Sequence, residues 1–79
     1  MVMASLVYFR KVSESTESVE YIFGFDTNDP PRRLLMDRKS RRSRPIDGEI
    51  DYAFIKASRK INALYEEASQ WPDHGMSVS

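Results

Sequence analysis

The 79-residue chain is predicted to be an α+β protein: a three-stranded antiparallel meander sheet followed by one C-terminal amphipathic helix packed on one face. Apolar side chains recur at every second position over residues 18–26 and at helical spacing over residues 51–70. The composition, 41% hydrophobic and 30% charged, is that of a globular chain. A chain of this length supports one hydrophobic core, so residues 1–79 are expected to form a single domain.

The first two strands are expected at residues 5–12 and 18–26. The segment SLVYFRKV is rich in β-branched and aromatic residues and is short for a helix. In the second segment Val19, Tyr21, Phe23 and Phe25 would share one face of a strand. The short polar link between the two segments favours an antiparallel hairpin. Gly24 has no Cβ, which leaves room for an aromatic ring from a neighbouring strand.

A third strand is expected at residues 32–38, after the turn sequence DTNDPP. Alternation would place Leu34 and Met36 on one side of this strand and Leu35 on the other. The two prolines that precede the strand have no N–H to donate to a sheet. They therefore favour an edge position for its start.

The change of period after residue 50 predicts a helix over residues 51–70. Asp47 and Asp51 are alternative N-caps, because a carboxylate there accepts a hydrogen bond from the first turn. The dipeptide Trp71-Pro72 is expected to end the helix, and residues 72–79 are expected to form a flexible tail. The predicted apolar face consists of Phe54, Ala57, Ile61, Leu64 and Ala68.

A single helix covers only one face of a sheet. The apolar stripe of the second strand is expected to lie beneath the helix, because the apolar face of the helix must be buried against something. The opposite face would then carry Val7, Phe9, Ile22 and Leu35, or their neighbours of the other parity. Self-association through that face is a hypothesis that follows from its apolar character.

The charge distribution is uneven, although 12 basic and 12 acidic residues cancel. Two hypotheses account for the basic cluster in residues 32–44. Its cations could bind a polyanion through counterion release. Alternatively, they form a solvated loop or pair with acids of the C-terminal half, within one chain or between chains. The cluster comprises Arg32, Arg33, Arg38, Lys39, Arg41, Arg42 and Arg44, and the acids are Asp47, Glu49, Asp51, Glu66 and Glu67.

The residues that enzymes use are sparse. The chain has no cysteine and one histidine, His74, which falls in the predicted tail. Its three glycines are too far apart for a phosphate-binding loop. The acids near residue 50 have the positions of helix-capping residues. We therefore expect no enzymatic activity, no cofactor and no metal ion.

No apolar run approaches the ~20 residues that cross a bilayer. The N-terminal sequence MVMASLVYFRK lacks a leading positive charge and differs from a signal peptide. These features predict a cytoplasmic protein without a membrane partner.

The segments VYFRKV, EYIFGFD, RRLLMD and QWPD resemble small proteins of high-GC Gram-positive (actinobacterial) species for which no activity is established. The resemblance covers most of the chain. It implies a bacterial cytoplasmic accessory protein and assigns no catalytic residue.

These observations predict a small non-enzymatic interaction module that acts through a protein surface, with homodimer formation as one form of that interaction. The alternative is a nucleic-acid-binding domain that uses the segment from Arg32 to Arg44. No small-molecule substrate is indicated.

Overall fold

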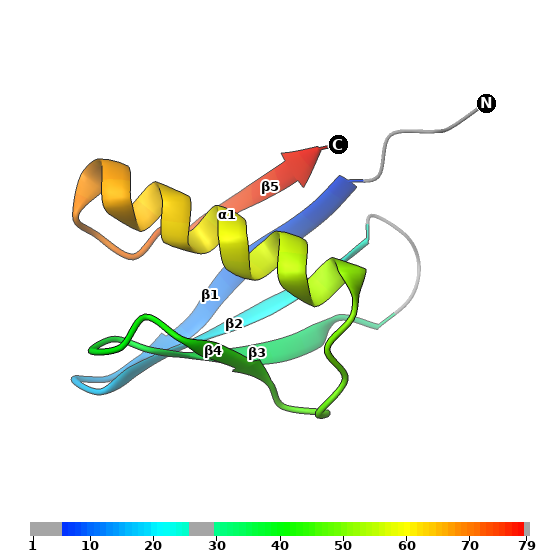
Figure 1. Ribbon diagram of the computed structural model, residues 1–79, viewed down its shortest axis with the longest axis horizontal. Coiled ribbons are helices and arrows are strands. Elements are labelled where there is room, and N and C mark those ends of the chain that lie inside the picture. Colours follow the sequence, from blue (N-terminus) through cyan, green and yellow to red (C-terminus); the bar gives the residue numbers. More distant parts are fainter. Residues whose placement is uncertain (1–5, 26–29, 79) are drawn as a thin grey trace.

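The computed structural model describes residues 6–25 and 30–78. They form a five-stranded antiparallel sheet with one helix lying diagonally across a single face, in two layers (Figure 1). The strand order across the sheet is β4-β3-β2-β1-β5. The elements are β1 (Leu6–Glu14), β2 (Ser18–Phe25), β3 (Arg32–Asp37), β4 (Ser43–Pro45), α1 (Tyr52–Ala68) and β5 (His74–Val78).

The predicted α+β class is confirmed, and the three predicted strands correspond to β1, β2 and β3. Residues 5 and 26–29, which include most of the predicted turn, lie outside the described part of the chain. Gly24 meets the expected aromatic ring, because the Tyr8 ring of β1 lies over it, with the nearest ring atom 3.6 Å from where a Cβ would stand. The predicted number of strands, however, was too small.

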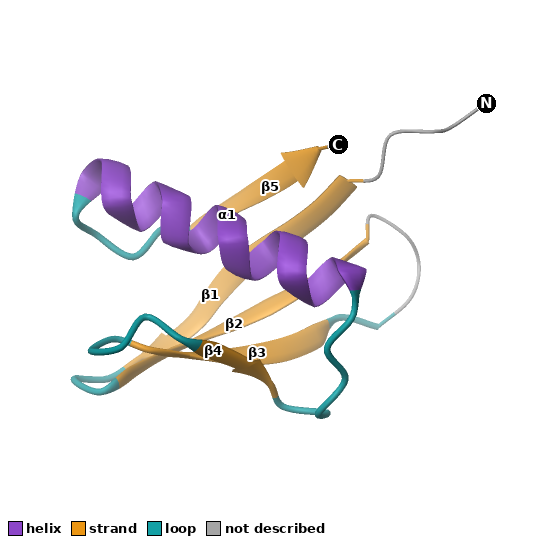
Figure 2. Cartoon of the chain, viewed as in Figure 1, coloured by secondary structure: helices purple, strands orange, loops and turns teal. Residues whose placement is uncertain are grey.

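The first correction concerns the predicted flexible tail at residues 72–79. His74–Val78 forms β5, which pairs antiparallel with β1 from Leu6 opposite Val78 to Arg10 opposite His74 (Figure 2). The buried Tyr21 hydroxyl donates a 2.8 Å hydrogen bond to the Pro72 carbonyl, which holds the chain beside the sheet just before β5 begins. Gly75 and Ser77 alternate with larger residues in this strand, but over five residues this period-two signal is too short to predict a strand.

The second correction concerns the basic segment, which is a hairpin and not only a loop. Residues Ser43–Pro45 form β4 and pair with Leu34–Met36, so β3 is an interior strand over that stretch, and its start at Arg32 and Arg33 lies outside the ladder with β4. The turn is closed by Asp37, whose carboxylate accepts hydrogen bonds from the Ser40 backbone N–H and hydroxyl. Arg41 adopts a left-handed backbone, with φ 61°, to complete that turn.

The helix is confirmed, with ends that the structure sets slightly inside the predicted range. Asp51 is the N-cap and accepts a hydrogen bond from the Phe54 backbone N–H. At the other end Ser69 adopts the left-handed conformation, and its N–H binds the Tyr65 carbonyl. Ser69 therefore ends the helix before Trp71-Pro72 is reached.

The core lies between α1 and one face of the sheet, as three of the four residues of the β2 stripe predicted; the fourth, Phe25, is 41% exposed and stacks on Tyr52. Val19, Tyr21 and Phe23 have no exposed surface. One expectation was wrong, because Ala68 is exposed. On β1 the second of the two parities left open applies, since Val7 and Phe9 are in the core. Their neighbours of the other parity point away from α1. Among residues 6–25 and 30–78 the core consists of Val7, Phe9, Val19, Tyr21, Phe23, Leu34, Met36, Ala53, Phe54, Ala57, Ile61 and Trp71.

A search of residues 6–25 and 30–78 finds no helix with the length and apolar character of a membrane span.

The contact between β5 and the core gives a first prediction. A Cβ at Gly75 would lie 2.6 Å from a ring atom of Phe9, so Gly75→Ala forces the strand or the ring to move. We expect this overpacking to lower the free energy of unfolding by about 1–3 kcal/mol. Urea unfolding followed by the fluorescence of the buried Trp71 measures the loss.

The matched control is Gly24→Ala, where the added Cβ makes an ordinary 3.6 Å contact with Tyr8. This change should alter stability by no more than about 0.5 kcal/mol, because nothing has to shift. Equal losses in the two variants would contradict the packing of β5 on Phe9.

Candidate functional site

The seven predicted polyanion-binding cations divide into two groups. Four form ion pairs with acids of the same chain: Arg32, Arg33, Arg38 and Arg41. Only Arg32 and Arg41 pair with the expected acids of the C-terminal half, whereas Arg33 and Arg38 pair with Glu20 and Glu14 of the first two strands. The other three, Lys39, Arg42 and Arg44, have no carboxylate of residues 6–25 or 30–78 within ion-pair distance. The surface available to a polyanion is therefore smaller than the sequence predicts.

Arg32 is the most constrained of the seven. Its guanidinium forms a two-bond fork with the Asp47 carboxylate, at 2.8 and 3.1 Å, and contacts both oxygens of Asp51 at 2.7 Å. It also donates to the Glu49 carbonyl and lies 4.8 Å from the centre of the Phe23 ring. With its donors occupied in this way, Arg32 has no free hydrogen-bonding capacity for a phosphate.

This arrangement, the Arg32 clamp, joins the start of β3 to the loop that leads into α1. The guanidinium of Arg32 lowers the pKa of Asp47 to about 2 and also lowers the pKa of Asp51. Because Asp51 is also the N-cap, the clamp sets where the helix begins. Asp47, the other predicted cap, binds Arg32 and the Glu49 backbone N–H instead.

The other three paired cations hold turns and strands together. Arg33 binds Glu20 on the neighbouring strand at 2.6 Å. Arg38 donates to the Ser15 carbonyl in the β1–β2 turn and pairs with Glu14. Arg41 pairs with Glu66 of α1, and its guanidinium lies 5.4 Å from the centre of the Tyr65 ring. The basic hairpin is thus tied to the rest of the fold on both sides.

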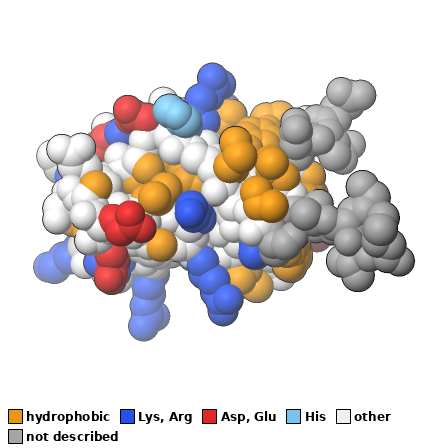
Figure 3. Space-filling view, turned by 90° about the horizontal axis from the view of Figure 1, so that it is seen from above, with side chains coloured by type: hydrophobic (Ala, Val, Ile, Leu, Met, Phe, Trp, Pro, Cys, Tyr) orange, Lys and Arg blue, Asp and Glu red, His pale blue; other side chains and the backbone are white. Residues whose placement is uncertain are grey.

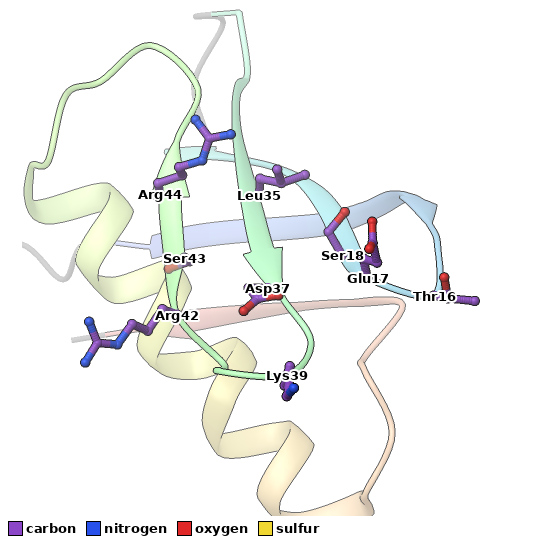
Figure 4. A pocket seen from close by; sticks show the side chains of 9 residues that line it. All are labelled: Thr16, Glu17, Ser18, Leu35, Asp37, Lys39, Arg42, Ser43 and Arg44. Carbon is purple, nitrogen blue, oxygen red and sulfur yellow. The ribbon is translucent and has the colours of Figure 1, made fainter.

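The three unpaired cations line an open hollow beside the β3–β4 hairpin. Arg42, Ser43 and Arg44 lie on one side of β3, and Thr16, Glu17 and Ser18 on the other (Figure 4). The Arg42 side chain points away from the other lining residues (Figure 4). Glu17 and Asp37 add two carboxylates to the hollow. The cations therefore do not converge on one point, as a phosphate site would require.

The sheet face opposite α1, here called the open face, has an apolar end and a charged end. At the apolar end Met76 of β5 is paired with Tyr8 of β1, and Val78 with Leu6. Ile22 lies in the middle, between Arg10 and Arg33. Met76 and Val78 are 53% and 59% exposed. A shallow groove on this face is lined mainly by apolar atoms, from Tyr8, Arg10, Ile22, Pro31, His74 and Met76 among others.

Two parts of this surface were not predicted from the sequence. His74 and Met76 were assigned to the flexible tail, but they stand on the open face opposite Arg10 and Tyr8. The alternation of Gly75 and Ser77 with larger residues is the one signal that could have indicated a strand there. Among the described residues no group of three or more His, Cys, Asp and Glu side chains is placed to hold a metal ion.

The Arg32 clamp gives a prediction about pH. The pKa of Asp47 and of Asp51 is lower in the folded chain than the ordinary value of 3.8, so both carboxylates stabilise the fold above about pH 4. That contribution is lost as the pH falls through the folded pKa values. Arg32→Gln should lower Tm at pH 7, and the gap from the wild type should close between about pH 4 and pH 2.

Circular dichroism melts at a series of pH values measure this gap. The control is Arg33→Gln, which removes a cation from the adjacent position. The Arg33 side chain is 56% exposed and forms an ion pair with one acid, Glu20. Its effect at pH 7 should be the smaller one, because exposed ion pairs contribute little. If the Tm difference between the wild type and Arg32→Gln stayed constant down to pH 2, the ion pairs of the Arg32 clamp could not be the cause of that difference.

No protein-family model, curated protein or solved structure matches this chain. The open face and the basic hairpin therefore have to be judged by their own geometry.

Proposed function

We propose that this protein is a non-enzymatic interaction module that binds a protein surface through the open face. The observation that carries the proposal is the placement of Tyr8, Ile22 and Leu35, with Met76 and Val78, on the sheet face that α1 does not cover.

A sheet face that only meets water is normally polar, since antiparallel sheets alternate apolar residues inward with polar residues outward. Here the outward positions of β1 and β5 are apolar at one end, at Leu6, Tyr8, Met76 and Val78. This apolar end also includes a groove, which is a shape that can receive a protruding side chain of a partner.

Charged residues border this apolar area on the side towards the charged end of the face, as polar residues border the core of an interface. Arg10 and His74 line one part of the groove, and the Arg33–Glu20 pair lies farther along the sheet. Mixed charges of this kind favour a partner with its own polar rim. They favour it over a lipid surface, which would select for cations alone.

Site-specific photocrosslinking in the source cells tests the proposal. A photoreactive residue at Ile22 should yield discrete protein adducts, because Ile22 is central on the open face. The same residue at Arg59, exposed on α1 on the other side of the molecule, is the matched control and should yield none. Adducts of equal yield at both positions, or none at position 22, would contradict the proposal.

A nucleic-acid-binding domain is the second candidate, and the three unpaired cations Lys39, Arg42 and Arg44 favour it. With three phosphate contacts, affinity for duplex DNA should fall roughly 40-fold between 50 and 200 mM salt, because log affinity changes by about −0.9 per contact. Arg42→Gln should reduce that salt dependence, whereas the paired Arg33 should tolerate the same change.

Fluorescence anisotropy with a labelled nonspecific duplex at the two salt concentrations provides the measurement. Absence of salt-sensitive binding at low ionic strength would remove this second candidate.

A further inference from the structure

Strand β5 is one edge of the sheet, and the direction of its backbone groups follows from one hydrogen bond. The Lys11 N–H donates to the Asp73 carbonyl at 2.7 Å, one step before the Arg10–His74 pair. Hydrogen-bonded and non-bonded pairs alternate along an antiparallel ladder, so Gly75 and Ser77 bond to β1. The N–H and C=O groups of His74, Met76 and Val78 therefore point away from the sheet.

The two edges of the sheet differ in how they are protected against pairing with another chain. The β4 edge has three residues, ends at Pro45 and carries Arg44. Proline, basic side chains and short length all discourage edge-to-edge pairing. The β5 edge has five residues without lysine, arginine or proline, and its register with β1 is regular. Only the β5 edge lacks these protective features.

We propose that a second copy of this chain binds the β5 edge, antiparallel to it, about a two-fold axis that passes through Met76. In this register Met76 lies opposite Met76 of the second copy, and His74 lies opposite Val78. His74, Met76 and Val78, whose backbone groups point away from the sheet, would then each donate one backbone hydrogen bond to the opposite residue of the second copy and accept one from it. A register centred on Gly75 or Ser77 would leave an outward residue unpaired at one end of each strand.

Side chains around the axis fit a second copy. The open faces of the two copies become one surface, on which the exposed Met76 of each copy meets Met76 of the other and the exposed Val78 meets His74. The two His74 side chains lie at opposite ends of the pairing, about 14 Å apart along the strands. The two Arg10 side chains are separated in the same way. Met76 is the residue that meets its own copy at the axis, and it carries no charge, so no like charges are brought together there.

On the side of α1 the pairing would bring together Gly75 and Ser77, which are too small to obstruct it. Figure 3 views the molecule from the side on which β5 lies in Figure 1. It shows hydrophobic side chains and the one histidine on this side of the molecule. Met76 and Val78 of β5 are 53% and 59% exposed, so the side chains of this edge are accessible to a second copy.

The size of the contact determines its strength. Stable interfaces bury about 800 Å² on each partner, and pairing of five residues along an edge covers less than that. We therefore expect a dimer that forms at micromolar concentrations or above and dissociates on dilution. The inference goes beyond the proposed function, because the open face stays uncovered and is doubled in the dimer.

Single-cysteine crosslinking tests the register directly, since the chain has no cysteine of its own. Met76→Cys should form a disulfide-linked dimer under mild oxidation, because paired Cα atoms about 5.5 Å apart suit a disulfide. Val78→Cys is the matched control: it is similarly exposed, on the same face, but its two copies would be about 14 Å apart. Loss of crosslinking in this control is the expected result.

Sedimentation of the cysteine-free chain over a range of concentrations provides the second measurement. Met76→Pro removes an outward N–H and spares the bonds of β5 to β1, so it should abolish the dimer without unfolding the chain. A wild-type monomer at millimolar concentration would overturn the proposal, as would equal crosslinking of the two cysteine variants. A dimer that persists in Met76→Pro but is lost in Ile22→Lys would also overturn it, and would support contact through the open face.

Discussion

Burial of the apolar stripe of α1 against one face of the sheet is the constraint on which the rest of this structure depends. Phe54 and Ile61 enter the layer above the buried side chains of β2, and full burial of such residues contributes about 1.5–3 kcal/mol each. The small Ala53 and Ala57 let the helix approach the sheet closely. Because the chain has one such helix, the second face of the sheet has no intramolecular cover among the described elements.

Polar groups at both ends of α1 hold the helix in place over that face. The Arg32 clamp fixes its N-terminus through Asp51, the residue that also caps it. Near its C-terminus Tyr65 stacks on the buried Trp71, with ring centres 4.2 Å apart. The hydrogen bond from Tyr21 then directs the chain into β5. Much of the basic segment therefore stabilises the fold, which limits its capacity to bind a ligand.

The same geometry separates the surface into regions of different character. Cations without a carboxylate partner gather at the β3–β4 hairpin, and apolar side chains gather where β1 and β5 meet on the open face. The apolar region adjoins an edge strand on which the backbone groups of His74, Met76 and Val78 point away from the rest of the described sheet. A face and an edge that both favour protein contact at one end of the molecule make that end the centre of the proposed interactions.

The sequence alone determined the features that depend on near neighbours. Period-two alternation located β2, helical spacing located α1, and the absence of a Cβ at Gly24 indicated a neighbouring ring, which is that of Tyr8. Each of these signals lies within a few residues, so no knowledge of long-range pairing was needed. The regular alternation in β2 also indicated three of its core side chains, Val19, Tyr21 and Phe23, but placed Phe25 with them although it is 41% exposed.

Tertiary structure alone decided the features that depend on partners far apart in the chain. Strand β5 exists because β1 offers it a free edge more than 60 residues earlier, and its own period-two signal is too short to predict a strand. The side of β1 that faces the core was ambiguous, because Leu6 and Tyr8 are as apolar as Val7 and Phe9, and only the pairing register distinguishes them. The partners of Arg32 and Arg41 are likewise set by the packing of α1, since ion pairs between distant residues leave no local pattern.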